Sequence, residues 1–366
     1  MLLPLKQSLL FALLLSLCGC DKREAIPLPE NRKAPNDDSS RVSITLLARI
    51  TGMAEGAAGR FDGFTVTRLD SFPALIQNLS SAAEFRDLGE IGPDEKIELV
   101  KRFVYEKRGI TFDSSQYRIE NIVPHLVWNN QRGSCLGVSL IFLMMGEKLN
   151  LPFHGVLLPG HFFVRYDDGS RRINLEPNRG GYSYTDSEYR KKYGVTDSSW
   201  YDLRNLTVDE VVSVFAYALG NIFLEGGKYD LAIEQYESCL NTIKDFGEAM
   251  GNMAIAYAGN DRPDKALELL SRARSLHPPL PDLHKNLGAL LSQQDKFKQA
   301  IREYQAGLKK SPGDADLLCG LAAAYYHSGS RDRAKQAVQQ AQGIDPDNPE
   351  VKRLLKVLEE QGKRTD

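Results

Sequence analysis

A period of 34 residues in the last third of the chain restricts what that part of the sequence can fold into. Small residues recur at this interval in two series: Gly220, Ala254, Gly288 and Ala322, then Ala232, Ala266, Ala300 and Ala334. Prolines close successive units at Pro278, Pro312 and Pro346. Small residues let two helices approach closely, and a fixed period means that each unit stacks on the next. The sequence therefore predicts a row of paired helices over residues 213–348.

This spacing resembles the tetratricopeptide repeat. Four repeats fit residues 213–348, and Glu350–Glu360 has the pattern of a capping helix. The resemblance implies a protein or peptide partner, bound on a concave face formed by the first helix of each repeat. The side chains expected on that face are Tyr217, Asn221, Lys285, Tyr326 and His327. The face could instead pack on the domain that precedes the repeats, and the sequence leaves both alternatives open.

Ahead of the repeats, the sequence places the residue types of an activated thiol close together. Cys135 follows Gly133-Ser134, a turn and N-cap, and opens an apolar helix expected over residues 135–149. The positive end of a helix dipole favours the thiolate form of such a cysteine. Strands are expected over residues 154–158, 161–166 and 171–175, so that His161 begins one strand and Glu176 follows its hairpin partner. Neighbours across a hairpin can share a hydrogen bond, which predicts a cysteine–histidine–carboxylate arrangement.

Three motifs in this region resemble a known family. They read G-S-C-L-G-V-S-L, P-G-H-F-F-V-R-Y and I-N-L-E-P-N-R-G-G, and they are similar to those of bacterial transglutaminase-like proteins of the SirB1 type. The resemblance covers residues 45–205 and implies an α+β fold of the papain-like superfamily. It also implies Cys135 as the nucleophile, His161 as the general base and Glu176 as the acid that orients the histidine. The superfamily usually has aspartate at the third position, so the longer glutamate requires a shifted geometry.

The resemblance suggests further roles and leaves the function open between several classes. Gln131 and Trp128, just upstream of Cys135, are candidates for an oxyanion hole. As an enzyme, the protein would be a cysteine peptidase, an amidase or an acyl transferase. Alternatively, it is a non-catalytic scaffold in which the three residues are structural, or an envelope assembly factor whose repeats recognise the partner.

The first twenty residues have the pattern of a targeting segment. Leu9–Leu17 is an apolar run too short to span a bilayer, and it leads to Leu-Cys-Gly-Cys, which resembles the lipobox of bacterial lipoproteins. The resemblance implies lipidation of Cys20, a membrane-anchored protein of the bacterial cell envelope, and retention at the inner membrane through Asp21. A secretory signal cut nearby and an uncleaved anchor are the alternatives.

Composition excludes other function classes and completes the expected organisation. The formal net charge is −2, so no basic excess is present to neutralise nucleic-acid phosphates. The six histidines are scattered, and neither a C-x-x-C nor an H-E-x-x-H motif occurs, so we expect no metal and no cofactor. The expected segments are a signal peptide (1–19), a flexible tether (20–41), a transglutaminase-like domain (42–205) and a tetratricopeptide domain (206–361).

Overall fold

A computed structural model describes residues 45–58, 60, 71–114, 118–195, 202–274, 276 and 282–362. The expected signal peptide, Cys20, the tether and Pro278 lie outside the described residues. The described chain divides into two compact units. The N-terminal unit holds residues 45–226 and 234–244, and the C-terminal unit holds residues 227–233 and 245–362.

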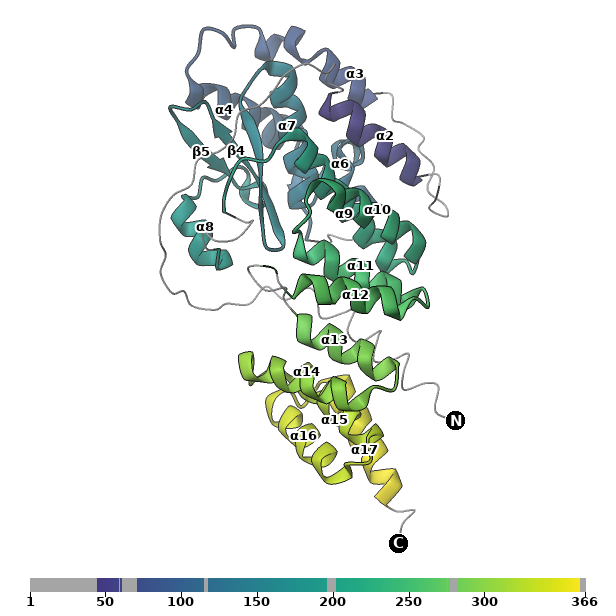
Figure 1. Cartoon of the computed structure of the whole chain (residues 1–366). Coiled ribbons are helices and arrows are strands. Elements are labelled where there is room, and N and C mark those ends of the chain that lie inside the picture. Colours follow the sequence, from purple (N-terminus) through teal and green to yellow (C-terminus); the bar gives the residue numbers. More distant parts are fainter. Residues whose placement is uncertain are drawn as a thin grey trace. The chain divides into compact units, whose positions relative to one another are not determined.

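The N-terminal unit begins with short helices that surround one long buried helix, α7 (Figure 1). They are α2 (Leu46–Ala58), α3 (Ser71–Gln77), η1 (Leu79–Ser81), η2 (Ala83–Phe85), α4 (Pro93–Lys101), the π-helical turn η3 (Arg102–Lys107), α5 (Ile119–Ile122) and α6 (Pro124–Asn130). Proline in the first turn starts α4 and α6, where the missing N–H leaves no hydrogen bond unmade.

Helix α7 (Cys135–Leu149) is the centre of this unit because its sequence is apolar on every side. Residues 135–146 are all buried, as expected for a helix enclosed by other elements. The helices α2, α3, α5 and α6 pack on it, and so do two strands of the sheet. It ends at Asn150, which adopts a left-handed conformation just before Leu151-Pro152.

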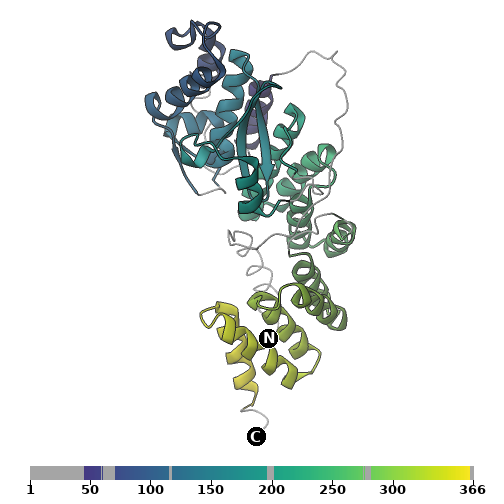
Figure 2. The same ribbon diagram turned by 90° about the vertical axis from the view of Figure 1, so that its left-hand side faces the viewer.

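The sheet has three antiparallel strands in the order β3 (Phe153–Leu158), β4 (His161–Asp167) and β5 (Arg172–Leu175). Figure 2 shows these strands as one layer beside the helices. All three lie within a residue or two of the ranges expected from the sequence. A second, two-stranded sheet pairs β1 (Thr111–Phe112) in parallel with β2 (Arg132–Gly133), immediately before Cys135.

A buried arginine fastens the elements that follow the sheet. The side chain of Arg165 on β4 has no exposed surface. Its guanidinium donates to Asn174 Oδ1 (2.7 Å), to Asp186 Oδ1 (2.6 Å) and to the Leu203 carbonyl. Asp186 is the first residue of α8 (Asp186–Tyr193), which follows η4 (Pro177–Arg179). The arginine therefore ties α8 to β4 and β5 with charge-assisted hydrogen bonds.

The first repeat helix belongs to the N-terminal unit. Helix α9 (Val208–Glu225) packs on α2 and α5, and Asp209 pairs with Arg49 at 2.5 Å. It also meets α10 (Tyr229–Thr242), whose Tyr236 ring would lie 2.6 Å from a Cβ at Gly220. These contacts join the first repeat helix to the helices of the transglutaminase-like region, and whether the concave face holds a peptide or packs on that region stays a prediction.

The C-terminal unit is a run of paired helices. The pairs are α11 (Gly247–Gly259) with α12 (Pro263–Ala273), α13 (Leu283–Gln293) with α14 (Phe297–Lys310), and α15 (Ala315–His327) with α16 (Arg331–Ile344). Helix α17 (Pro349–Gly362) covers the last pair through buried Val351, Leu354 and Leu358. The predicted fold class, an α+β domain followed by repeated helix pairs, is confirmed.

The repeats match a small residue to a large one between paired helices. A Cβ at Gly288 would lie 2.6 Å from the Tyr304 ring, the same relation as between Gly220 and Tyr236. The other two repeats have alanine at the small position, and Leu270 or Val338 replaces the tyrosine. Glycine therefore occurs in the repeats where the facing side chain is an aromatic ring, which requires the closest approach of the backbone.

Candidate active site

Cys135 lies at the N-terminus of α7, on a backbone that neighbouring segments hold in place. Ser134, the N-cap, accepts the Gly137 N–H through Oγ (3.3 Å). Its own N–H and hydroxyl both donate to the Asn121 carbonyl, at 2.8 and 3.0 Å. A Cβ at residue 137 would lie 2.2 Å from that carbonyl, so only glycine allows α7 to begin this close to α5.

His161 and Glu176 meet diagonally across the hairpin. The register pairs Val164 with Leu175, so Glu176 lies opposite residue 163. His161 is two residues before that position and on the same face of the sheet, which makes His161 and Glu176 diagonal neighbours. The imidazole Nε2 lies 2.9 Å from Glu176 Oε2. The sequence predicted contact between these two positions, and the longer glutamate side chain spans the diagonal.

The cysteine completes this arrangement. The Cys135 side chain lies close enough to His161 to interact with the imidazole and favour its charged form. All three side chains are buried, with exposed fractions of 9% for Cys135, 5% for His161 and 2% for Glu176.

Glu176 is held as a charged acceptor by three donors. Besides the imidazole, the Asn178 N–H donates to Oε1 (3.0 Å) and the Tyr189 hydroxyl donates to Oε2 (3.0 Å). Burial alone would raise the pKa of this carboxyl, but these hydrogen bonds and the charge on His161 outweigh burial and lower it. The carboxylate is therefore ionised at neutral pH.

The histidine is correspondingly biased towards its protonated form. Burial opposes its charge, but hydrogen bonds to Cys135 and Glu176, together with the charges of both groups, raise the pKa of His161 to about 9. An imidazolium at this position can stabilise negative charge on a neighbouring group and can give a proton to a leaving group.

Aromatic side chains from α8 cover the histidine. The Tyr193 ring is stacked on the imidazole with centroids 5.1 Å apart and an interplanar angle of 1°. Tyr189 stacks on Phe163 at 4.1 Å and 8° while its hydroxyl reaches Glu176. Sequence reasoning did not single out either tyrosine. Their spacing of four residues, which places both on one face of a helix, was the available signal.

The two candidates for the oxyanion hole lie upstream of the nucleophile in different environments. Gln131 caps α6 in a left-handed conformation, and its side-chain amide donates to the Arg108 carbonyl at 2.6 Å. Trp128 is buried, and its ring lies 5.9 Å from that of Phe103 and 4.8 Å from the Arg108 guanidinium. The oxyanion role of both residues stays a prediction.

The two other cysteines in the described residues lie among the repeats. Cys239 and Cys319 are buried, and burial raises the pKa of each thiol to about 12. Within the described residues, no group of three or more His, Cys, Asp or Glu side chains could hold a metal ion. In the same part of the chain, no helix is both long and apolar enough to cross a membrane.

The residues expected on the repeat face have varied surroundings. In the N-terminal unit, buried Asn221 accepts the Tyr236 hydroxyl (2.8 Å), and half-buried Tyr217 lies 6.0 Å from the same ring. In the C-terminal unit, Lys285 is only 4% exposed and pairs with Asp282 (3.1 Å) and Asp316 (3.7 Å). Half-buried His327 lies 5.3 Å from the Tyr326 ring and stacks on Phe297. Their role in peptide binding stays a prediction.

Comparison with known protein families finds two kinds of domain in the chain. Residues 70–196 match the family model of the transglutaminase-like superfamily, and residues 217–281 and 291–358 match tetratricopeptide repeat models. The chain therefore contains a transglutaminase-like core domain followed by tetratricopeptide repeats.

Each of the following relatives matches part of the chain. A UPF0162 protein from Xylella fastidiosa is 23% identical over 194 residues, which cover 50% of this chain and 68% of the relative. The photosystem I assembly protein Ycf3 of Prochlorococcus marinus is 36% identical over 87 residues, which cover 23% of this chain and 50% of the relative. Among solved structures, YrrB, described as a TPR protein with an unusual peptide-binding site, aligns with a TM-score of 0.36 and 21% identity. That alignment covers 41% of this chain and 77% of YrrB.

Proposed function

We propose that the transglutaminase-like domain catalyses cysteine-dependent acyl transfer or hydrolysis of an amide, and that the repeats bind a protein or peptide partner. The observation that carries the proposal is that α7, β4 and the end of β5 bring Cys135, His161 and Glu176 together, with His161 Nε2 2.9 Å from Glu176 Oε2 and Cys135 close enough to act on the imidazole. A histidine between a thiol and an ionised carboxylate is the arrangement that cysteine nucleophiles require.

In this proposal each residue has a defined step. The Cys135 thiolate attacks the amide carbonyl carbon, and the carbonyl electrons move to oxygen. As the oxyanion collapses, the C–N bond breaks and the His161 imidazolium gives its proton to the departing amine. Water or a second amine then attacks the thioester while His161 takes its proton. Breaking of the C–S bond releases an acid or a new amide and regenerates the thiolate.

Supporting groups stabilise the charges that these steps create. Glu176 holds the imidazolium in orientation and is itself fixed by Tyr189 and Asn178. The first N–H groups of a helix have no carbonyl partner within the helix, so those at the start of α7 can donate to the oxyanion. Gln131 and Trp128 are the side chains that we propose as further donors.

Alkylation of the cysteines tests the proposal directly. Iodoacetamide at pH 7 should modify Cys135 faster than Cys239 and Cys319, because burial raises the pKa of the latter two thiols to about 12. Mapping the modified sites by mass spectrometry in the folded protein gives the three rates. His161→Gln should slow Cys135 and leave the other two unchanged. Equal rates at all three cysteines would refute an activated nucleophile.

The pH dependence of the reaction with substrate gives a second test. With substrate, the rate should fall on the alkaline side with an apparent pKa near 9, because the imidazolium that protonates the leaving amine loses its proton there. Alkylation, which has no leaving amine, should not fall above pH 9. A substrate rate that keeps rising to pH 10 would contradict the assignment of His161 as the acid.

One observation favours a second function, a non-catalytic interaction scaffold. The three side chains are at most 9% exposed, and Tyr193 lies flat on the imidazole. In this alternative the trio stabilises the domain, and recognition belongs to the repeats. Complementation in cells by Cys135→Ala separates the two functions, because the scaffold needs no thiol and the enzyme cannot work without it.

We also propose that the protein is lipid-anchored in the bacterial cell envelope through Cys20. The support is the Leu-Cys-Gly-Cys sequence after a short apolar run, followed by a polar tether. Labelling of cells with palmitate should mark the wild-type protein and not Cys20→Ser. Equal labelling of both would remove the anchor from the proposal.

A further inference from the structure

A tyrosine-rich surface with two exposed cations adjoins the candidate active site. Arg179, at the end of η4, and Lys192, in the last turn of α8, both lie over the Tyr184 ring, at 5.8 and 5.6 Å from its centroid. Tyr182, which is 57% exposed, meets the same ring edge-on at 5.0 Å. These four residues, Arg179, Tyr182, Tyr184 and Lys192, are called the tyrosine shelf below.

The shelf is continuous with the trio through two aromatic contacts. Tyr184 lies 5.4 Å from Tyr189, whose hydroxyl donates to Glu176. The Lys192 ammonium lies 5.1 Å from the Tyr193 ring, which stacks on His161 at 5.1 Å. The ammonium is thus within about one Debye length of the imidazole, roughly 10 Å at 0.1 M ionic strength, so its charge acts on ligands that approach the thiol.

Both cations of the shelf are available to a ligand. Within the described residues, neither Arg179 nor Lys192 forms an ion pair with a carboxylate, and both are exposed. Residues 177–195 contain four basic and two acidic side chains, although the net charge of the whole chain is −2. Of the two acids, Asp186 pairs with buried Arg165, and Glu188 accepts hydrogen bonds from Thr185. The surface therefore has an excess of positive charge.

We infer that the tyrosine shelf binds an acidic peptide and delivers it to the candidate nucleophile. The exposed Tyr182 ring offers apolar contact to an extended chain, and the two cations select carboxylate side chains. A nucleic acid would need a larger basic excess than this chain has. The inference rests on the proposed function for the identity of the substrate, but binding of the peptide can be measured without any reaction.

Fluorescence anisotropy with two labelled hexapeptides tests the shelf in the full-length protein. One peptide alternates glutamate and alanine, and the other replaces each glutamate with glutamine. We expect the acidic peptide to bind more tightly. Arg179→Gln or Lys192→Gln should each weaken it about two- to fivefold, the range of exposed charge pairs, and the double variant should weaken it about tenfold. The glutamine peptide should not distinguish the variants.

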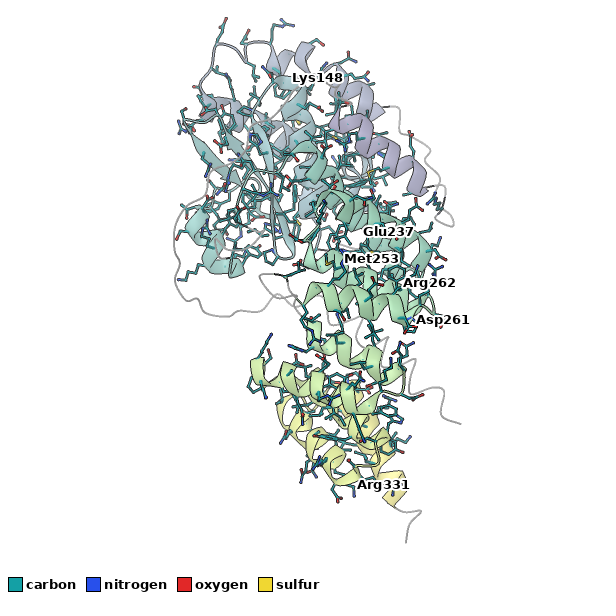
Figure 3. All side chains as sticks on the ribbon, in the orientation of Figure 1. Lys148, Glu237, Met253, Asp261, Arg262 and Arg331 are labelled. Carbon is teal, nitrogen blue, oxygen red and sulfur yellow. The ribbon has the colours of Figure 1, made fainter. Side chains whose placement is uncertain are left out.

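Lys148→Gln is the matched control, because it removes the same charge from another exposed lysine of the N-terminal unit. Figure 3 labels Lys148, which lies in the last turn of α7. It is thirteen residues beyond Cys135, or about 20 Å at 1.5 Å per helical residue. Binding by Lys148→Gln should equal that of the wild type. An equal loss of affinity for the acidic peptide in all the variants, Lys148→Gln included, would overturn the inference. Equal affinity for the two peptides would also overturn it. The inference would fail as well if Arg179 and Lys192 were needed for binding of anionic phospholipid vesicles while the acidic peptide did not bind.

Alkylation separates failure of the shelf from failure of the proposed function. The acidic peptide should protect Cys135 from iodoacetamide in the wild type and not in the Arg179→Gln/Lys192→Gln variant. Peptide binding that depends on the shelf, without selective alkylation of Cys135, would refute the catalytic proposal and retain the binding site. Selective alkylation of Cys135 without shelf-dependent peptide binding would refute the binding site and retain the catalytic proposal.

Discussion

Glu176→Gln is the substitution that most directly tests how the candidate site is held together. Glutamine keeps the volume of the side chain and can still accept the Asn178 N–H through its oxygen. The other terminal atom becomes an amide donor, which cannot accept from His161 Nε2 or from the Tyr189 hydroxyl. The change therefore removes a buried charge and reverses the polarity of two hydrogen bonds without leaving a cavity.

The expected cost is large for a single isosteric change. Removing one member of a buried ion pair usually destabilises a protein by about 3–5 kcal/mol. Here the carboxylate is 2% exposed, so no solvent replaces its lost contacts. The retained bond to Asn178 offsets part of the loss, which puts the expected decrease in the free energy of unfolding at about 3 kcal/mol.

The decrease should depend on pH in a defined sense. The pKa of Glu176 is lowered from its ordinary 4.5, so its contribution is present above that value and lost as the pH falls. The pKa of His161 is raised from 6.5 to about 9, so its contribution is complete below 6.5 and lost as the pH rises through 9. The difference between wild type and variant should be greatest between about pH 4.5 and 6.5.

Urea denaturation followed by tryptophan fluorescence measures this difference in the relevant domain. Both tryptophans of the chain, Trp128 and Trp200, precede the repeats, so the signal does not come from the tetratricopeptide domain. The unfolding free energies of the two proteins should be compared at pH 5.5, 7 and 9. A difference that is constant across this range, or below about 0.5 kcal/mol at pH 5.5, the scatter of ordinary surface substitutions, would refute the ion-pair reasoning.

Two further substitutions test the supporting contacts. Tyr189→Phe removes one of the three donors to Glu176 and keeps the ring, so it should cost about 1–2 kcal/mol of unfolding free energy and move the alkaline limb of the substrate rate to a new apparent pKa. A change in stability with an unaltered pH profile would limit the tyrosine to packing. Gly288→Ala should cost about 1–3 kcal/mol in thermal denaturation, because its Cβ would lie 2.6 Å from the Tyr304 ring, whereas Gly313→Ala, with no atom within 4 Å, should be near neutral.

Much of the fold could be predicted because its signals are local or periodic. The repeats follow from small residues at a fixed interval, and the start of α7 follows from an N-capping serine before an apolar run. The hairpin follows from two apolar runs around Asp167-Asp168-Gly169-Ser170. Each of these features is decided by residues close together in the chain, so no tertiary information is needed to find it.

The support of the site depends on contacts between distant segments, which no local pattern contains. The Asn121 carbonyl that anchors Ser134 is thirteen residues away, and only the close approach of α5 to α7 brings them together. Tyr189 reaches Glu176 because Arg165 holds the first residue of α8. A buried arginine in an apolar strand could be noticed in the sequence, but its partners could not.

The glutamate at the third position becomes understandable once Tyr189 is included. The acid approaches the histidine along the diagonal of the hairpin, a longer path than between directly opposed residues, and the additional methylene covers that distance. A longer side chain has one more rotatable bond, and its entropy must be overcome by fixed partners. The backbone N–H of Asn178 and the hydroxyl of Tyr189 supply those partners, one on each oxygen.

The departure from aspartate is therefore compatible with an oriented imidazole, and it means that α8 contributes a contact that fixes the acid of the candidate site. Because the same helix also carries Tyr193 and Lys192, the group that orients the acid and the surface that we propose to receive the peptide are fixed by one element.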